Sequence, residues 1–498
     1  MSYFTGLFIL ELFSTLVYDC FGLSNYSNDK QIECPSPSCT CNGTSATCSD
    51  NYLSYIPRFP GMISRVYILN ANLGNISDEG LSNLTFNYIE RLVFNNCSIK
   101  SLSQYTFMNV TCIRTLAISW NPSLTTEDVQ RSFKYLNISC LRTIALTYNS
   151  WNTLPNGTFH SLSRIEHIDL SGNKLRILNC TEFVDLHALF SLKVRSNYIS
   201  DTVLEPMTSL GELSLGDNRL IEIPNWCDVK FNSYFPNLRS LSLDNNFISE
   251  LNQIRCLPKL KELFLKHNLI KLIPANAFSE LVLLKNLSLL QAGNPVKTIQ
   301  EFAFNSSSLV SLSLRRCNTH FGKMNASAIS KLFSTSPALE ILDLGENYLP
   351  RDPIVLLAMI SQPNKLKRLN LNTARLYHLP KGVFLHLKYL EKLVLYGNRI
   401  TGWGNGYEIF GNMTSLKILD LGANLITIIN ETSFPASVLS SLEMINLSFN
   451  SFYCVCDQMW FVNWLRRTNV TLKRAPYICT QPKELMGTKL KNYKPTIE

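Results

Sequence analysis

Cysteine is the residue of this sequence whose spacing most clearly predicts chemistry. Four of the fifteen cysteines fall within residues 34–48, in the order Cys34-x4-Cys39-x-Cys41-x6-Cys48, and three more lie within residues 454–479. Closely spaced cysteines form disulfides in an oxidising compartment or bind zinc as thiolates. Clusters at both ends of a long chain predict disulfide-stapled caps, and a zinc site in the first cluster is the alternative.

Other patterns of catalytic chemistry are missing from the sequence. It contains no HExxH, GxxxxGK[ST], GxSxG, EF-hand or dinucleotide-binding motif. Its seven histidines form no cluster with metal-ligand spacing, and Gly402, Gly404 and Gly406 lack the strand-to-helix context of a phosphate-binding loop. We therefore expect a protein that is not an enzyme and that uses no metal or cofactor.

Two features predict the secretory pathway. Residues 4–17 form an apolar run that is too short to span a membrane, so we expect residues 1–22 to be a signal peptide, with a buried N-terminal helix as the alternative. Sixteen Asn-x-Ser/Thr sequons favour a glycosylated surface, in a compartment where cysteines oxidise. The expected glycan sites are Asn75, Asn83, Asn109, Asn137, Asn156, Asn179, Asn286, Asn305, Asn325, Asn412, Asn430, Asn446 and Asn469.

Length and composition narrow the architecture that must position these residues. The chain has 498 residues, of which 46% are hydrophobic and 17% charged, with a formal net charge of +9. A single globular core stops growing at roughly 250–300 residues, so the chain is either several domains or one repeat array. The positive charge permits an anionic partner without requiring one.

One pattern, LxxLxLxxNxL, recurs sixteen times between Ile63 and Leu442, with a mean period of about 25 residues. Positions 4 and 6 are apolar and alternate with polar positions 3, 5 and 7, which is the period of a strand with one buried face. Asparagine fills position 9 in eleven repeats, where its side chain can pair backbone groups of neighbouring turns. Cysteine (Cys97, Cys317) or alanine (Ala71, Ala292, Ala374) replaces it in the other five.

Phenylalanines supply a second signal on the return side of the repeats. Six of them fall 18 residues after the first position of their repeat and two fall 20 residues after it. Residues at one phase stack from turn to turn, so we expect a spine beneath the convex face. The eight residues are Phe107, Phe159, Phe183, Phe278, Phe304, Phe384, Phe410 and Phe434.

These patterns predict an α/β solenoid, a horseshoe with a parallel concave β-sheet and a cysteine-rich cap at each end. One repeat cannot bury its own apolar face, whereas stacked repeats can, and the terminal turns need covers. We expect an N-terminal cap over residues 23–62, about sixteen repeats over residues 63–452, and a C-terminal cap over residues 453–498 that is truncated.

Equal phase also brings two internal cysteines together. Cys112 and Cys140 each precede position 1 of consecutive repeats, so their Cα atoms should lie one strand spacing apart, within disulfide reach. We predict a bond between them. Cys227 and Cys256 are a second, weaker candidate pair.

The repeats and the end clusters together resemble extracellular leucine-rich-repeat proteins. That resemblance implies the pairs Cys34–Cys41, Cys39–Cys48 and Cys454–Cys479. It leaves Cys456 without a partner, because the C-terminal cap of such proteins has a fourth cysteine.

The segment FVNWL (residues 461–465), followed by TNVT (residues 468–471), makes the chain similar to a Toll-like receptor ectodomain. The resemblance implies binding of a microbial or endogenous ligand and ligand-induced homo- or heterodimerisation that triggers innate immune signalling. It also implies a membrane anchor outside this chain and a location at the cell surface or in the endosome lumen. A soluble secreted recognition protein and a matrix or cell-adhesion protein are the alternatives.

Candidate ligand contacts are basic residues near the concave face, namely Lys266, His267, Arg315 and Arg316. Below pH ~6.5, protonated His267 would strengthen binding of an acidic ligand. Two sequons, Asn286 and Asn446, fall on strand positions, and glycans there would obstruct the concave face. This favours a glycan-free lateral face as the binding surface.

Overall fold

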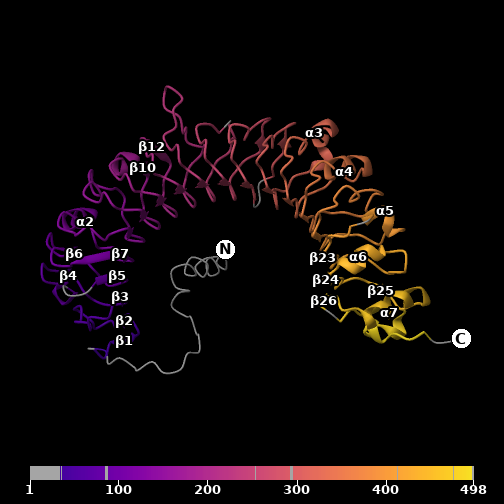
Figure 1. Cartoon of the computed structure of the whole chain (residues 1–498), viewed down its shortest axis with the longest axis horizontal. Coiled ribbons are helices and arrows are strands. Elements are labelled where there is room, and N and C mark those ends of the chain that lie inside the picture. The colour runs from indigo at the N-terminus through magenta and orange to yellow at the C-terminus, as the bar shows by residue number, and fades with distance from the viewer. Residues whose placement is uncertain are drawn as a thin grey trace.

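The computed structural model forms an open arc, with strands along the inner edge and helices and loops along the outer edge (Figure 1). It describes residue 34 and residues 36–84, 88–252, 254–291, 295–411, 413–474 and 476–495. The expected signal peptide lies outside the described residues. No helix in those ranges is long and apolar enough to cross a membrane.

A single sheet of nineteen strands lines the concave side of the arc. Its first two strands pair antiparallel, and every later pairing is parallel. Three strands belong to the caps and the other sixteen belong one to each predicted repeat, which confirms the repeat pattern. In spatial order the strands are β1 (Cys39–Asn42), β2 (Ser45–Ser49), β3 (Arg65–Leu69), β5 (Tyr88–Asn95), β7 (Cys112–Ser119), β8 (Thr143–Ala145), β9 (His167–Asp169), β11 (Ser191–Lys193), β13 (Glu212–Ser214), β14 (Ser240–Ser242), β15 (Glu262–Phe264), β17 (Asn286–Ser288), β19 (Ser311–Ser313), β20 (Ile341–Asp343), β21 (Arg368–Asn370), β22 (Lys392–Val394), β23 (Ile418–Asp420), β24 (Met444–Asn446) and β26 (Thr471–Lys473).

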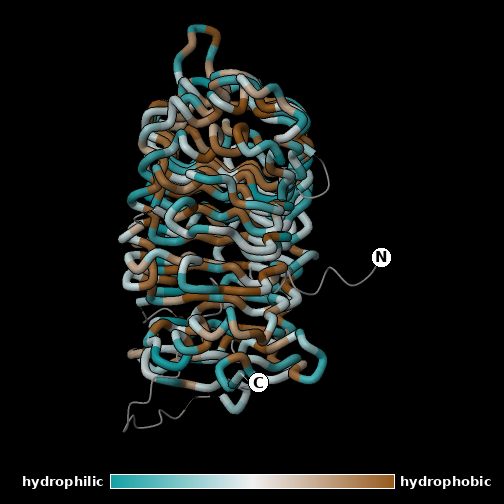
Figure 2. The backbone as a smooth tube through the Cα atoms, turned by 90° about the vertical axis from the view of Figure 1, so that its right-hand side faces the viewer, coloured by the Kyte–Doolittle hydropathy of each residue, from teal (hydrophilic) through white to brown (hydrophobic). Residues whose placement is uncertain are grey.

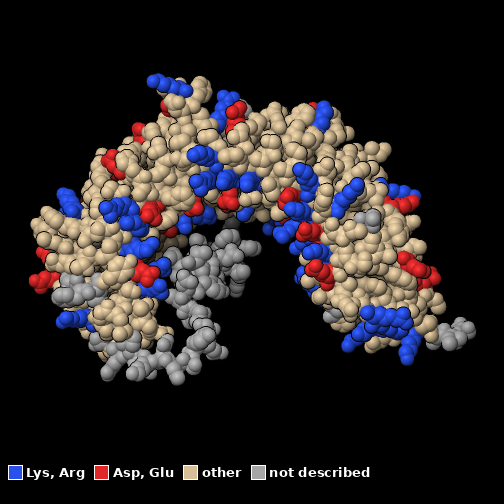
Figure 3. Space-filling model, in the orientation of Figure 1, with Lys and Arg blue, Asp and Glu red and all other residues tan. Residues whose placement is uncertain are grey.

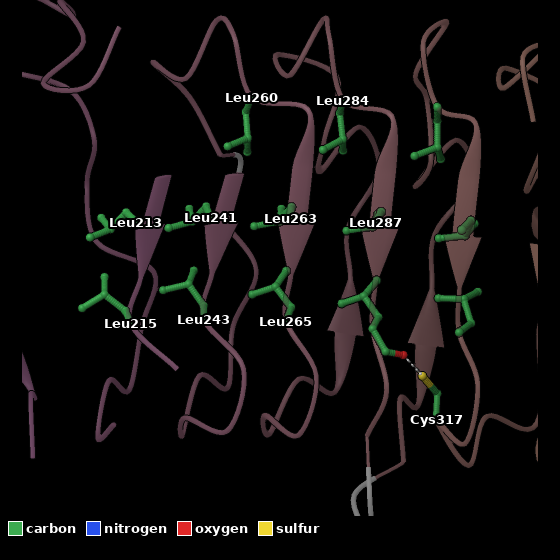
Figure 4. Packing of buried hydrophobic residues seen from close by; sticks show 14 of the residues in the cluster. Leu213, Leu215, Leu241, Leu243, Leu260, Leu263, Leu265, Leu284, Leu287 and Cys317 are labelled. Atoms are coloured by element: carbon green, nitrogen blue, oxygen red, sulfur yellow. Dashed lines mark hydrogen bonds between the residues drawn. The ribbon is translucent and has the colours of Figure 1, made fainter. Parts of the chain in front are cut away.

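The leucines of the repeat stack in rows behind the sheet. Leu213, Leu241, Leu263 and Leu287 pair in register across four strands, and the leucines two positions later form a parallel row (Figure 4). The central residue of each of these strands is buried while its two neighbours are partly or fully exposed. Alternation therefore places the apolar row inside and leaves the polar positions on the concave surface.

Asparagine at position 9 holds successive turns together. The Oδ1 atom of Asn398 accepts bonds from the backbone N–H groups of Ala374 (2.9 Å) and Leu376 (3.0 Å) in the preceding turn. Its Nδ2 atom donates to the carbonyl oxygens of Leu371 (2.9 Å) and Leu395 (2.8 Å). The amide thus pairs four backbone groups that the solenoid buries.

Where cysteine replaces this asparagine, only part of the pattern remains. The Sγ atom of Cys317 donates to the Leu289 carbonyl oxygen (Figure 4), and that of Cys97 donates to the Ile68 carbonyl oxygen. Burial raises the pKa of Cys97 to about 11 and that of Cys317 to about 12, so both thiols stay protonated.

The outer side of the arc is built from short helices and two-stranded sheets. The 30-residue step between Leu309 and Leu339 is folded into η4 (Phe321–Lys323) and α3 rather than left as a loop. The helices are α2 (Thr126–Phe133), α3 (Ala326–Ser330), α4 (Pro353–Ile360), α5 (Gly406–Phe410), α6 (Ala436–Ser441) and α7 (Met459–Arg467), and the further 3-10 turns are η2 (Ser82–Leu84), η3 (Cys180–Phe183), η5 (Cys456–Gln458), η6 (Lys483–Leu485) and η7 (Leu490–Asn492). The small sheets pair β4 (Asn75–Ile76) with β6 (Ser101–Leu102), β10 (Ile177–Asn179) with β12 (Asp201–Val203), β16 (Leu272–Ile273) with β18 (Thr298–Ile299), and β25 (Phe452–Tyr453) with β27 (Cys479–Gln481).

The expected phenylalanine spine exists, in separate runs. One run stacks Phe278, Phe304 and Phe333, with ring centroids 6.2 and 6.1 Å apart. A second joins Phe384, Phe410 and Phe434 at 6.2 and 5.7 Å. Phe159 packs on Phe183 at 5.6 Å and Phe107 on Phe133 at 6.4 Å. Phe133 is the last residue of α2, and Phe333 lies three residues after the end of α3. Neither phenylalanine belongs to the set from which the spine was predicted.

Disulfides stabilise the caps at both ends of the solenoid, and two further disulfides link neighbouring turns within it. The N-terminal pairs are Cys34–Cys41 and Cys39–Cys48, and the C-terminal pair is Cys454–Cys479, as the resemblance implied. Cys112 and Cys140 are bonded with Cα atoms 5.5 Å apart, and the weaker candidates Cys227 and Cys256 are bonded at 5.4 Å. Within the described ranges, Cys97, Cys180 and Cys317 are free and buried, and Cys456 is free and exposed.

Candidate ligand-binding surfaces

Lys266 and His267 follow β15, where the chain turns off the sheet. The backbone N–H of Lys266 donates to Asp244 Oδ1 at 2.7 Å, and its ammonium lies 5.4 Å from the centre of the Phe264 ring. His267 is partly buried, and burial, helped by Lys266 and Arg316, lowers its pKa below 6.5 against the pull of Asp244. The imidazole therefore gains its charge at a lower pH than the sequence-based hypothesis assumed.

Arg315 and Arg316 share one carboxylate. Arg315 Nη2 lies 2.7 Å from Glu346 Oε1, and Arg316 Nε lies 3.8 Å from Glu346 Oε2. Both arginines follow β19, which is separated from β15 only by β17, and the positive charge of Arg316 contributes to lowering the pKa of His267. The structure thus brings the four predicted contact residues into one neighbourhood, but the two arginines are already partly neutralised by Glu346.

A basic hollow in the concave face lies further toward the C-terminus. Its lining includes four basic side chains, Arg315, Lys392, Lys473 and Arg474, and one carboxylate, Asp420. Asp420 is engaged within the sheet, because it accepts bonds from the Gly422 N–H (3.1 Å) and from Asn446 Nδ2 (2.8 Å). A ligand in this hollow meets an excess of positive charge.

One wall of the hollow comes from the C-terminal cap. Strand β26 pairs with β24 and brings Lys473 to the sheet, and Arg474 follows it in the left-handed backbone region. The Arg474 guanidinium lies 5.5 Å from the centre of the Tyr396 ring, and Nη1 is 3.4 Å from the Tyr396 hydroxyl. Sequence reasoning missed both basic residues, because β26 lies outside the repeat pattern that identified concave positions. In Figure 3, Lys and Arg side chains gather along the inner rim of the arc, with Asp and Glu between them.

The two sequons on concave strands, Asn446 and Asn286, have side chains that are bonded within the sheet, whereas the sequence led us to expect glycans there that obstruct the concave face. Asn446 is 2% exposed, its Nδ2 group donates to Asp420, and its Oδ1 atom accepts from the Ser448 N–H (3.1 Å) and hydroxyl (2.8 Å). A side chain buried to this extent leaves no room for a glycan in the folded sheet, so we expect Asn446 to be unmodified. Asn286 is half-buried and its Nδ2 atom donates to Glu262 Oε1 at 3.1 Å.

Most other sequons lie away from the strands. Asn83 is half-buried with its Nδ2 atom 2.7 Å from the Ile56 carbonyl oxygen, and Asn179 and Asn305 are also half-buried. Asn412 lies outside the described residues. The exposed members are Asn75, Asn109, Asn137, Asn156, Asn325, Asn430 and Asn469.

A loop over residues 226–234 projects from the outer edge of the arc, at the top of Figures 1 and 2. An antiparallel bridge between Cys227 and Ser233 closes it, and the Cys227–Cys256 disulfide ties its base to the next turn. Val229 and Phe231 are exposed at its tip, at 97% and 74%. The 28-residue step between Leu210 and Leu238 was its signal in the sequence.

No group of three or more His, Cys, Asp or Glu residues in the described part of the chain is placed to hold a metal ion. The surfaces described above offer charged and hydrogen-bonding side chains beside the concave sheet.

Comparison with known proteins agrees with this architecture. A leucine-rich-repeat family model matches residues 139–199 and 236–295. The chain is 27% identical to mouse CD180 antigen over 346 residues, which cover 68% of this chain and 50% of that protein. It is 34% identical to human Toll-like receptor 5 over 161 residues, which cover 32% of this chain and 18% of the receptor. Mouse podocan matches at 29% identity over 239 residues, covering 43% of this chain and 37% of podocan.

Two solved structures share the fold. A TLR13–ssRNA13 complex matches with a TM-score of 0.56 at 20% identity, covering 90% of this chain and 77% of that one. A Drosophila Toll–Spätzle complex matches with a TM-score of 0.54 at 19% identity, covering 91% and 64%. The present chain spans half the length of CD180 antigen and less of Toll-like receptor 5.

Proposed function

Because the chain is a capped leucine-rich-repeat horseshoe of the Toll-like receptor ectodomain type, we propose that it is the ligand-binding part of an innate immune receptor. Ligand binding joins two ectodomains and thereby brings their C-terminal caps together. The free energy for this step is the difference between binding to the dimer and to the monomer. The protein acts on the extracellular or lumenal side of a membrane and carries out no catalysis.

The observation that carries this proposal is the basic hollow shared by β21–β24 and the C-terminal cap. Lys473 and Arg474 belong to the cap, whereas Lys392 and Asp420 belong to the repeats. A ligand held there touches the cap directly. Binding in the hollow is therefore coupled to the element that must approach its counterpart in a dimer.

The test is a chimera in which this chain is fused to a membrane span and a signalling domain that reports dimerisation. Cells bearing the chimera are exposed to separate preparations of bacterial lipopeptide, flagellin, lipopolysaccharide and single-stranded RNA. We expect one preparation to give a dose-dependent response that Lys473→Glu/Arg474→Glu reduces at least tenfold. The matched control is Lys483→Glu/Lys489→Glu, which makes the same charge change elsewhere in the cap. An equal loss in both variants, or no response to any preparation, would refute the proposal.

A matrix or cell-adhesion role is the second candidate, favoured by the similarity to podocan. In that role the protein binds a fixed partner without dimerising. Sedimentation velocity of the secreted chain, with and without the active preparation, separates the two. A shift from monomer to dimer supports the receptor, and a constant monomer recovered in the extracellular matrix fraction supports the matrix protein.

A further inference from the structure

A stack of three flat side chains lies on the flank of the solenoid, where the chain leaves the concave sheet. The Tyr348 ring is packed on one side by His320, with ring centroids 3.8 Å apart and planes 12° apart. The Arg375 guanidinium lies 4.1 Å from the centre of the same ring, and its Nη2 atom is 3.2 Å from the Tyr348 hydroxyl. Burial, Lys323 and Arg375 all lower the pKa of His320, so at neutral pH it contributes a ring and no charge.

A second stack repeats this arrangement one turn further along. The guanidinium groups of Arg351 and Arg399 lie 5.3 and 5.5 Å from the centre of the Tyr377 ring. Arg399 Nη1 also donates to the Tyr377 hydroxyl at 2.9 Å. The three arginines come from three consecutive repeats, since Arg351 follows β20, Arg375 follows β21 and Arg399 follows β22.

These three guanidinium groups have no carboxylate partner. No ion pair within the described residues includes Arg351, Arg375 or Arg399. A second hollow, separate from the basic hollow, is lined by Glu346, Tyr348 and Arg375. The Glu346 carboxylate is shared by Arg315 and Arg316. The nearby Asp352 carboxylate caps helix α4 by accepting a bond from the Ile354 N–H. Stacking on tyrosine fixes each guanidinium while its remaining N–H groups stay available, which is the arrangement that binds tetrahedral anions.

The flank also lacks glycosylation signals. No sequon falls between Asn325 and Asn412, the interval that contains all three arginines and both tyrosines. None of the five residues that form the two Arg–Tyr stacks lies in a sequon, and the neighbouring sequon at Asn325 falls five residues after His320.

We propose that this flank, defined by Arg351, Arg375 and Arg399 on their tyrosines, is a binding site for a sulfated polysaccharide. A row of unpaired cations on successive turns matches a linear polyanion, because each turn advances by about 5 Å at the sheet. Single-stranded nucleic acid fits less well. Proteins bind it by stacking bases on open aromatic faces, and here Tyr348 and Tyr377 have ring neighbours that already occupy those faces.

The test measures binding of heparin to the glycosylated chain by biolayer interferometry over a range of NaCl concentrations. The triple variant Arg351→Gln/Arg375→Gln/Arg399→Gln should bind at least 30-fold more weakly at 150 mM NaCl. Its plot of log affinity against log salt should also be shallower by about two to three, because fewer counterions are released. The control Arg65→Gln/Arg142→Gln/Lys331→Gln removes the same charge from ion-paired residues and should change affinity less than threefold.

A second variant, Tyr348→Phe/Tyr377→Phe, keeps the rings and removes the hydroxyl acceptors. It should weaken heparin binding several-fold without changing the salt slope, because the charges remain but are less well oriented. Equal losses in the triple variant and its control, or tighter binding of polyuridylate than of heparin at equal charge, would overturn the proposal. The signalling response of the chimera should be retained in the triple variant. The heparin-binding proposal and the receptor proposal are therefore tested by separate measurements, and either can be refuted without the other.

Discussion

Asn446 Nδ2 donates to Asp420 Oδ1 at 2.8 Å, across two neighbouring strands of the concave sheet. Both residues occupy position 5 of their repeats, a position that alternation points toward the ligand side. The bond holds the amide of a sequon in the sheet, where Asn446 is 2% exposed, and it occupies one oxygen of a carboxylate that lines the basic hollow. The burial of Asn446 disfavours a glycan there, and one oxygen of Asp420 is already engaged by a partner within the sheet.

The burial of Asn446 predicts that this sequon is not glycosylated in the folded, secreted protein. Glycopeptide mass spectrometry should find Asn446 unmodified, whereas exposed Asn325 should carry glycan. Asn446→Gln should leave the mobility of the protein on a gel unchanged, and Asn325→Gln should increase it. Full occupancy of Asn446 in folded material would contradict its burial in the sheet.

The position-9 asparagines should carry much of the stability of the solenoid. Asn398→Ala leaves four buried backbone groups without their partner, and each such group costs about 1–3 kcal/mol, so we expect a loss of about 3 kcal/mol or more. Urea unfolding followed by circular dichroism measures this loss. Exposed Asn152→Ala serves as control and should change the free energy of unfolding by less than about 0.5 kcal/mol.

The Cys227–Cys256 disulfide should hold the projecting loop. Its two residues are 29 apart in sequence, and closing a loop of that length in the unfolded chain predicts about 3.6 kcal/mol of stabilisation. In Cys227→Ala/Cys256→Ala, hydrogen exchange should rise over residues 226–234. The variant Cys112→Ala/Cys140→Ala, which removes a distant disulfide, should leave that segment unchanged. Unaltered exchange in the first variant would show that the bridge does not restrain the loop.

His267 should titrate below its ordinary pKa, and Asp244 should oppose that shift. Since folding lowers the pKa of His267, the unfolded chain binds its proton first as the pH falls through 6.5, and stability decreases toward acid pH. Asp244→Asn removes an attractive charge and should lower the pKa of His267 further. NMR titration of the imidazole measures both effects, with His267→Gln giving the assignment. An unchanged or raised pKa in Asp244→Asn would refute the electrostatic argument.

The fold and the internal disulfides could be read from the sequence because both depend on phase. Leu263 and Leu287 belong to one row because they occupy one position of the repeat, and Cys112 pairs with Cys140 for the same reason. Asn398 bonds to the N–H of Leu376 because a position-9 asparagine faces position 11 of the preceding turn, and ten of the eleven such asparagines accept this bond. The position of a residue within its repeat therefore predicts which residues of the neighbouring turn it contacts.

The candidate sites depend on contacts that phase does not encode. Sequence reasoning selected Arg315 and Arg316 as candidate ligand contacts, but Glu346 on the next turn neutralises part of their charge. It expected glycan at Asn446, which the structure buries between neighbouring strands, bonded to Asp420. It did not find Arg474, which reaches Tyr396 across 78 residues of sequence through the pairing of β26 with β24.

The sequence by itself determined that the chain is a coil of about sixteen stacked turns with disulfide-closed ends, because a repeating apolar pattern has one way to bury its leucines. Only the tertiary structure decided which surface charges are paired. Arg351, Arg375 and Arg399 have no carboxylate partner and lie on tyrosines because turn-to-turn packing brings flank side chains of neighbouring repeats together. Tyr348, Arg375 and Arg399 share position 10 of their repeats, but the repeat pattern leaves the residue type at that position open, so these contacts appear only when neighbouring turns are in place.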